Sequence, residues 1–296
     1  MKPDVCFISR TDPTDVAPNA ASVVEIALCF RDVTAAGGRC QSARLGEDEV
    51  PPNRHAEGVR VLCVPMPSPF PPAEPHGDLQ PIFENAWFVT GSVLFKPLVR
   101  LVRNMVVLRH DGELTLVNAV RLDAEGELAL DALGKVAHIM KIGIHGMDDA
   151  YYADRYGAKL WAADPEGGAT ELAEATELPL PGVKVFRFRD TLSPEAALHV
   201  ERDGGLLVTC DSVQHWVPHP LMSTGAKIIT ALMGFRNPAQ IGPPWRKIQT
   251  PPGGSLREDF DRLASLPFDK LIGGHGGLLE ANASRVLGES IKRTFD

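Results

Sequence analysis

Short apolar runs and polar turn signals alternate along the chain from about residue 78 onward. Runs typical of β-strands occur at 105–108, 114–117, 159–162, 183–188, 197–200, 206–209 and 270–274. An Asp-Gly step follows His110 and another follows Arg202, each between two such runs, and Asp-Gly tolerates the positive φ of tight turns. These patterns predict two β-hairpins and three further strands.

Other stretches repeat their apolar residues at helical spacing. The spacing predicts helices over 127–140 and 149–156, the second ended by Gly157. Ser255 and Glu258 have the spacing of a capping box, which predicts a helix start there, and a last helix is expected from about 279. Hairpins mixed with helices indicate an α/β (α+β) protein with much antiparallel sheet.

Residues 1–77 have a different pattern. Polar and small residues alternate there, and the segment ends in a proline cluster at 65–75, which favours extended and poorly packed backbone. We therefore expect residues 1–77 to be a poorly ordered N-terminal extension and residues 78–296 to be the folded domain.

Composition narrows the class of partner. A net charge of −8 argues against nucleic acid and against an anionic membrane surface as the main partner. The five cysteines contain no CxxC pair, and no basic segment followed by an apolar stretch marks a secretory signal. Both features predict a cytoplasmic protein; the oligomeric state stays open.

Candidate metal ligands stand where three β-type runs end. His145, Asp148 and Asp149 follow the run at 141–144, Asp211 follows 206–209, and His275 follows 270–274. Side chains from strand ends can converge on one edge of a sheet and form a metal site. Each segment also has a simpler interpretation, in turn a helix cap, a turn aspartate and a glycine-rich loop.

Taken together, the three segments resemble the metallo-β-lactamase fold from about residue 78 to the end. That resemblance implies a four-layer αββα sandwich and a metal-binding motif, HxHxDH. His145 matches its first histidine and Asp149 its aspartate, whereas Met147 and Ala150 replace the other two histidines. Asp211 resembles the family's bridging aspartate and His275 its final histidine.

The family's middle histidine has no counterpart. The matching stretch, 188–196, offers only Asp190 or Glu195 as a chemical substitute. The resemblance then implies one mononuclear site built from His145, Asp149, Asp211 and His275, with Glu195 as an added ligand. Such mixed nitrogen and oxygen ligands suit a divalent metal, zinc first, with iron and manganese as alternatives.

The implied activity is hydrolysis of a small ester, thioester or related substrate by a metal-bound water. Asp148 would accept a proton and Asp149 would orient the water. Tyr152, His215 and Trp216 are expected to line the substrate pocket, and Cys210 is expected to be an inert buried thiol. Two alternatives stay open: an inactive binding or regulatory module, and an iron-dependent redox protein.

Overall fold

A computed structural model describes residues 69–296 and, before them, the backbone of three strands that form one antiparallel sheet, β1 (Asp4–Ser9), β2 (Val24–Phe30) and β3 (Gln41–Ser42). The chain divides into two compact units, Met1–Pro71 and Pro72–Asp296. The expected low order of residues 1–77 falls mostly on residues outside the described ones. Among the residues that are described, no helix has the length and apolar character needed to cross a membrane.

The second unit contains a seven-stranded mixed sheet in the order β10-β9-β8-β7-β6-β5-β4. Strands β4 to β7 pair antiparallel, while β7, β8, β9 and β10 run parallel. The bounds are β4 Gln80–Phe83, β5 Ala86–Lys96, β6 Val99–His110, β7 Glu113–Val117, β8 Lys135–Lys141, β9 Lys159–Ala162 and β10 Thr170–Glu171.

A second sheet has the order β11-β12-β13-β16, with β13 and β16 parallel and the other pairs antiparallel. Its strands are β11 Val183–Arg187, β12 Ala196–Val200, β13 Leu206–Val208 and β16 Lys270–Ile272. Two short strands, β14 Val213–Gln214 and β15 Gln240–Ile241, pair beside it. The helices are α1 Ala124–Leu133, α2 Asp149–Tyr156, η1 Glu166–Gly168, α3 Thr224–Leu232, α4 Pro243–Gln249, α5 Arg257–Ala264 and α6 Ala283–Phe295.

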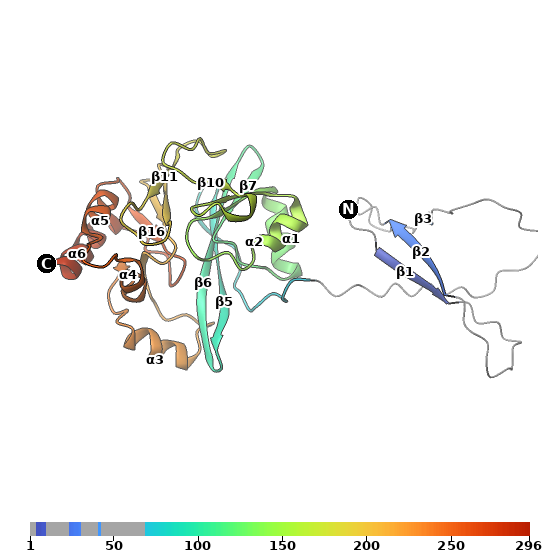
Figure 1. Ribbon diagram of the computed structural model, residues 1–296, viewed down its shortest axis with the longest axis horizontal. Helices are drawn as coiled ribbons and strands as arrows, with labels where there is room; N and C mark the ends of the chain where they lie inside the picture. Colours follow the sequence, from blue (N-terminus) through green and yellow to red (C-terminus); the bar gives the residue numbers. More distant parts are fainter. Residues whose placement is uncertain (1–3, 10–23, 31–40, 43–68) are drawn as a thin grey trace, which may run out of the picture. The chain divides into compact units, whose positions relative to one another are not determined.

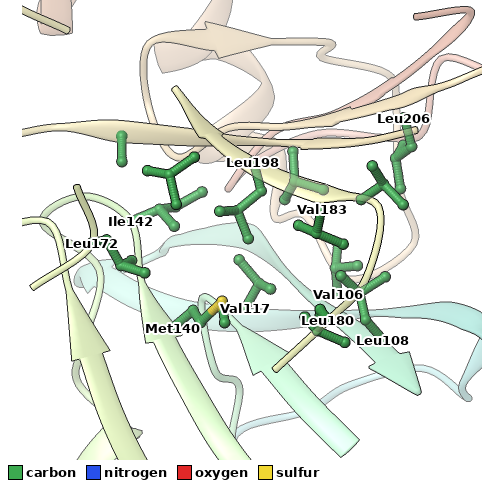
Figure 2. Packing of buried hydrophobic residues seen from close by; sticks show 14 of the residues in the cluster. Val106, Leu108, Val117, Met140, Ile142, Leu172, Leu180, Val183, Leu198 and Leu206 are labelled. Carbon is green, nitrogen blue, oxygen red and sulfur yellow. The ribbon is translucent and has the colours of Figure 1, made fainter. Parts of the chain in front are cut away.

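Alternating side chains on the strands produce the layers, because successive residues of a strand point to opposite faces. On β6, Val106 and Leu108 face the second sheet, whereas Met105 and Val107 face α1 and α2. On β13, Leu206 and Val208 face the first sheet, and Leu207 faces the other way, into the cluster with α4, α5 and α6. Figure 2 shows the side chains between the two sheets.

The result is helix, sheet, sheet, helix, which Figure 1 shows across the second unit from α1 and α2 to α5 and α6. This arrangement confirms the predicted αββα sandwich. Both hairpins are confirmed, as are the predicted strands near 159, 183 and 270 and the helix at 149–156. Buried hydrophobic clusters fill the space between the two sheets and the space between each sheet and its helices.

The predicted helix over 127–140 is wrong in its second half. Helix α1 ends at Leu133, and Lys135–Lys141 is strand β8, which pairs with β7 and β9. Gly134 has φ 154°, and a Cβ there would lie 2.4 Å from the carbonyl oxygen of Gly112, so only glycine fits the break. Pairing on both edges outweighs the helical spacing of the apolar residues.

Two helices, α5 and α6, begin later than the sequence predicts. Helix α5 begins at Arg257 with Leu256 as its N-cap residue, and Ser255 Oγ accepts from the N–H of Arg257, so the predicted capping box does not form. Helix α6 begins at Ala283 rather than near 279. Strands β4 and β5 and helices α3 and α4 had no predicted counterpart.

Candidate metal centre

Three strand ends bring His145, Asp211 and His275 together. Strands β13 and β16 are parallel, so the residues that follow them leave the sheet at the same edge, and His145 lies in the loop after β8. The Nε2 atom of His145 is 3.2 Å from Oδ2 of Asp211, and Nε2 of His275 is 3.3 Å from Oδ1 of the same carboxylate. The structure thus places these three sequence-predicted ligands in mutual contact.

Asn104, on β6, fixes the loop that carries His275. Its backbone N–H donates to the carbonyl of Gly274, and its side-chain amide donates to the carbonyls of Gly273 and Gly276 at 2.9 and 3.1 Å. The second sheet and the first are also joined directly, because the N–H of Ala196 donates to the carbonyl of Ile142 at 2.8 Å. The ligand loops are therefore tied to both sheets.

The hydrogen bond at the other ring nitrogen decides the tautomer of His275. Nδ1 lies 2.5 Å from the carbonyl oxygen of Val102, which accepts only, so Nδ1 carries the proton. Burial, with the nearby His145, lowers the pKa of His275 to about 4, and the ring is neutral at pH 7. Its Nε2 lone pair therefore faces Asp211.

Asp211 is ionised in spite of its burial. Burial would raise the pKa of Asp211, but the hydrogen bond from His145 holds it below its ordinary value. Gln214 Nε2 donates to Oδ1 at 2.9 Å, and Trp216 donates to Oε1 of Gln214 while stacking on His275. The indole and the amide thus orient the carboxylate and the imidazole.

Glu195 and Cys210 lie beside this cluster. The carboxyl of Glu195 is fully buried, and neither of its oxygens has a hydrogen-bond partner, although Trp245 and the backbone of Asp211 and Ser212 lie close by. Burial, with the charge of Asp211, raises the pKa of Glu195 to about 8. A Cβ at Gly143 would lie 2.8 Å from Sγ of Cys210 and 3.0 Å from Oε2 of Glu195, so glycine is required for this approach.

The two aspartates after His145 have different surroundings. Asp148 forms a buried ion pair with Arg103, and its Oδ2 also accepts from the N–H of Arg121 at 2.8 Å. This engagement opposes the predicted role of Asp148 as proton acceptor. Asp149 is buried with Oδ1 unpartnered, and burial raises its pKa to about 7 despite the opposing charge of Lys141.

Of the three predicted pocket residues, one lines the cavity and two do not. Trp216 lines a cavity of about 240 Å³ that opens beside Asp211 and His275. Tyr152 does not reach it: its side chain is buried under the first sheet, where the hydroxyl donates to the carbonyl of Val120 at 2.9 Å and accepts from the N–H of Leu122. His215 contributes its carbonyl to the N–H of Gly277 and does not line the cavity.

Most of the cavity wall is apolar. The polar lining comes from Ser193, Asp211, Gln214, Thr230, Gln249 and His275, and the apolar lining from Phe95, Leu101, Ile144, Trp216, Ile229, Met233, Phe235, Pro244, Trp245 and Ile248. Of these polar groups, Gln214 and His275 contact the ionised carboxylate of Asp211.

The donor set fits a divalent cation. Side-chain donors of His145, Cys210 and Asp211 all lie within 4.8 Å of one another. The neutral Nε2 of His275 and the carboxylate of Asp211 are two acceptors face to face, an arrangement that a cation stabilises. The buried, unpartnered oxygens of Glu195 lie beside Cys210 and offer a further donor, whereas the predicted ligand Asp149 is not in this donor group. Imidazole, carboxylate and thiolate together suit zinc or iron.

Sequence reasoning missed several contributors. Cys210 is a buried thiol, as predicted, and burial raises its pKa, but its sulfur also lies within the group of candidate metal donors, which the sequence did not indicate. Arg103, Asn104 and Gln214 stand within β-type runs or loops that match no motif, and only the pairing of strands reveals their contacts.

Solved metallo-β-lactamase structures are similar to this chain. The metallo-β-lactamase from Hirschia baltica matches with a TM-score of 0.53 and 12% identity, over 75% of this chain and 98% of that one. FIM-1 from Pseudomonas aeruginosa, in its mono-zinc form, matches with a TM-score of 0.51 and 10% identity, over 76% and 98%. No protein-family model and no curated protein matches the sequence. Identities this low establish the fold alone: the chain has the metallo-β-lactamase fold, as its sequence predicts.

Proposed function

We propose that the protein is a metal-dependent hydrolase of a small ester, thioester or related substrate, with a single metal held by His145, Asp211 and His275. Cys210 and Glu195 are the candidates to complete the ligand set. The observation that carries the proposal is the neutral Nε2 of His275 facing the ionised Asp211 at 3.3 Å.

A divalent cation bound there supplies Lewis-acid chemistry: it lowers the pKa of a coordinated water towards neutrality and polarises a carbonyl group. The protein's own residues supply orientation. Val102 fixes the tautomer of His275 through its carbonyl oxygen, and Gln214 fixes the carboxylate of Asp211.

The two aspartates after His145 differ in what they can do. Asp148 is held by Arg103, and we assign it the positioning of the loop after β8. Burial raises the pKa of Asp149 to about 7, which suits proton exchange near neutral pH, but its side chain does not line the cavity, so the proposal gives it no contact with the substrate.

The cavity beside the centre would hold the substrate. Trp216, Phe235 and Trp245 supply apolar walls, which favour a substrate whose acyl or alcohol group is apolar. Water is excluded where the substrate contacts those walls.

Elemental analysis of the purified, untagged protein tests the proposal, with the double variant Asp211→Ala/His275→Ala as comparison. We expect near-stoichiometric metal that is lost in the double variant, followed by ester or thioester hydrolysis in a substrate screen. As a control, Asp203→Ala removes an exposed carboxylate outside the centre and should leave the metal content unchanged.

Other outcomes would select the other functions. No metal after reconstitution would overturn the proposal in favour of a binding or regulatory module that lacks catalysis. Iron with a redox-active absorption spectrum and no hydrolysis would favour an oxidation–reduction role for the same ligands.

A further inference from the structure

An apolar face surrounds the mouth of the cavity. Eleven large hydrophobic side chains are exposed in the described part of the chain, and nine of them come from the segments that also line the cavity. These nine are Leu94, Phe95 and Leu98 at the β5–β6 hairpin tip, Ile144 and Met147 in the loop after β8, Ile228, Leu232 and Met233 at α3, and Ile248 in α4. Exposed apolar side chains gathered on one face mark an interaction site.

The hairpin tip and α3 form one continuous part of this face. Ser223, the N-cap of α3, donates from its hydroxyl to the carbonyl of Leu98 at 2.8 Å and accepts from the N–H of Arg100. In Figure 1 the β5–β6 hairpin extends past the sheets on the side where α3 lies. Leu98, at the tip, is 87% exposed, and Leu232, at the end of α3, is 79% exposed.

The hairpin, α3 and α4 have a charge opposite to that of the whole chain, and the two aspartates after Met147 in the loop after β8 are buried. The full sequence has 38 acidic and 30 basic residues, yet residues 85–110 and 212–257 contain no Asp or Glu. Exposed basic side chains stand beside the apolar ones: Lys96 at the hairpin tip, Lys227 in α3, Arg236 after it and Lys247 in α4. The negative net charge, which predicted no membrane partner, conceals this segregation.

We propose that this face docks on the surface of an anionic phospholipid bilayer, with the hairpin tip and α3 inserted among the headgroups and the basic side chains against lipid phosphates. Apolar insertion combined with flanking lysine and arginine is the pattern of interfacial membrane binding. A second copy on the same face would bring like charges together, which disfavours a symmetric dimer there.

The docking goes beyond the proposed hydrolysis and does not depend on metal. It places the cavity mouth at the lipid surface, because Phe95, Ile144, Met233 and Ile248 belong both to the exposed face and to the cavity lining. An amphiphile could then enter the cavity directly from the bilayer.

Co-sedimentation of the full-length protein with vesicles tests the proposal, using phosphatidylcholine alone and phosphatidylcholine mixed with phosphatidylglycerol. We expect binding to the mixed vesicles that weakens with added salt, and little binding to the neutral ones. Chelator-treated protein should bind the vesicles equally well. The docking proposal and the proposed metal-dependent hydrolysis can therefore fail independently of each other.

Surface variants locate the docking face. Leu98→Asn with Leu232→Gln should weaken binding at least about tenfold, and asparagine suits the φ of 68° at residue 98. The matched control is Leu128→Gln on α1, which removes a leucine that is 71% exposed on another helix and should leave binding unchanged. Lys96→Gln and Lys227→Gln should each weaken binding about fivefold, and Lys135→Gln on β8 should not.

Equal binding to both vesicle types, binding to neither, or equal losses in the control variants would overturn the proposal. So would light scattering that shows a dimer dissociated by the two leucine substitutions, with no vesicle binding, since that result assigns the face to a second copy. Thermal unfolding of each variant separates misfolding from lost docking, and the two lysine variants test the face if the leucine pair fails to fold.

Discussion

Asp211 and Glu195 are two buried carboxyl groups next to the same edge of the second sheet, and they are held in opposite protonation states. Asp211 contacts two imidazoles and an amide, and its pKa is below the ordinary value. Glu195 has no hydrogen-bond partner, and its pKa rises to about 8. Burial is common to both, so the difference comes from the neighbouring donors.

The difference indicates how the centre is assembled. Asp211 is ionised before any cation arrives, whereas Glu195 is neutral at pH 7 and must lose its proton to become a ligand. Asp211 and the two imidazoles would bind the cation first, and Glu195 would become a ligand when its carboxyl loses its proton. Four predictions test this contrast.

The largest effect on stability is expected at a third buried carboxylate, Asp148, when its partner Arg103 is removed. Arg103 and Asp148 have side-chain exposures of 7% and 11%, so Arg103→Met leaves a buried charge uncompensated. We expect the free energy of unfolding to fall by about 3–5 kcal/mol, measured by urea denaturation. Arg100→Met, at the more exposed pair with Glu74, should lower it by less than about 1 kcal/mol. Similar losses in both variants would mean that burial does not distinguish these pairs.

Metal affinity should separate Asp211 from Glu195 directly. Asp211→Asn keeps the shape of the side chain and removes the fixed anion, so affinity should fall at least about 100-fold. Glu195→Gln should lower it about tenfold, since the other ligands stay in place. Competition with a chromophoric chelator measures both. An unchanged affinity in Asp211→Asn would remove Asp211 from the ligand set.

The pH dependence of stability should reveal the neutral Glu195 in chelator-treated protein. Its pKa is about 8 when folded and near 4.5 as an ordinary value, so between these pH values the unfolded chain ionises while the folded protein keeps its proton. Stability contributed by the neutral group is therefore lost as pH rises from about 4.5 to 8, by up to about 1.4 kcal/mol for each pH unit.

Glu195→Gln should remove that decline, read from urea unfolding at a series of pH values. Asp149, with a pKa of about 7, contributes a similar decline that ends one pH unit lower. Asp149→Asn is thus a matched control, in which stability should still fall between pH 7 and 8. A Glu195→Gln variant with the wild-type slope in that interval would show that Glu195 is already ionised.

The sequence predicted one side of this contrast better than the other. His145, Asp211 and His275 each follow a β-type run, and strand ends converge, so their meeting could be expected before the structure. The protonation state of Glu195 could not be expected, because it depends on the absence of hydrogen bonds from the surrounding loops. Nothing in the sequence indicates that both of its oxygens are buried without a hydrogen-bond partner.

The same limit applies to the fold. Local turn signals predict the hairpins, whereas the apolar spacing in β8 predicts a helix, because the pairing of β8 with β7 and β9 is not local. Arg103 and Asn104 bind Asp148 and the loop of His275, which lie 45 or more residues away in the chain. Local patterns predict elements, and contacts between distant elements decide which polar residues join the site.

The smallest expected effect is a difference of one proton released on metal binding. At pH 7 the carboxyl of Glu195 is mostly protonated, so metal binding should release about one proton more from the wild-type protein than from Glu195→Gln. Titration calorimetry in buffers of different ionisation enthalpy measures the difference. The difference should shrink towards zero above pH 9, where Glu195 is already ionised in both states. Equal proton release at pH 7 would instead indicate that Glu195 stays neutral beside the metal, and that Asp211 with the two imidazoles holds the cation without it.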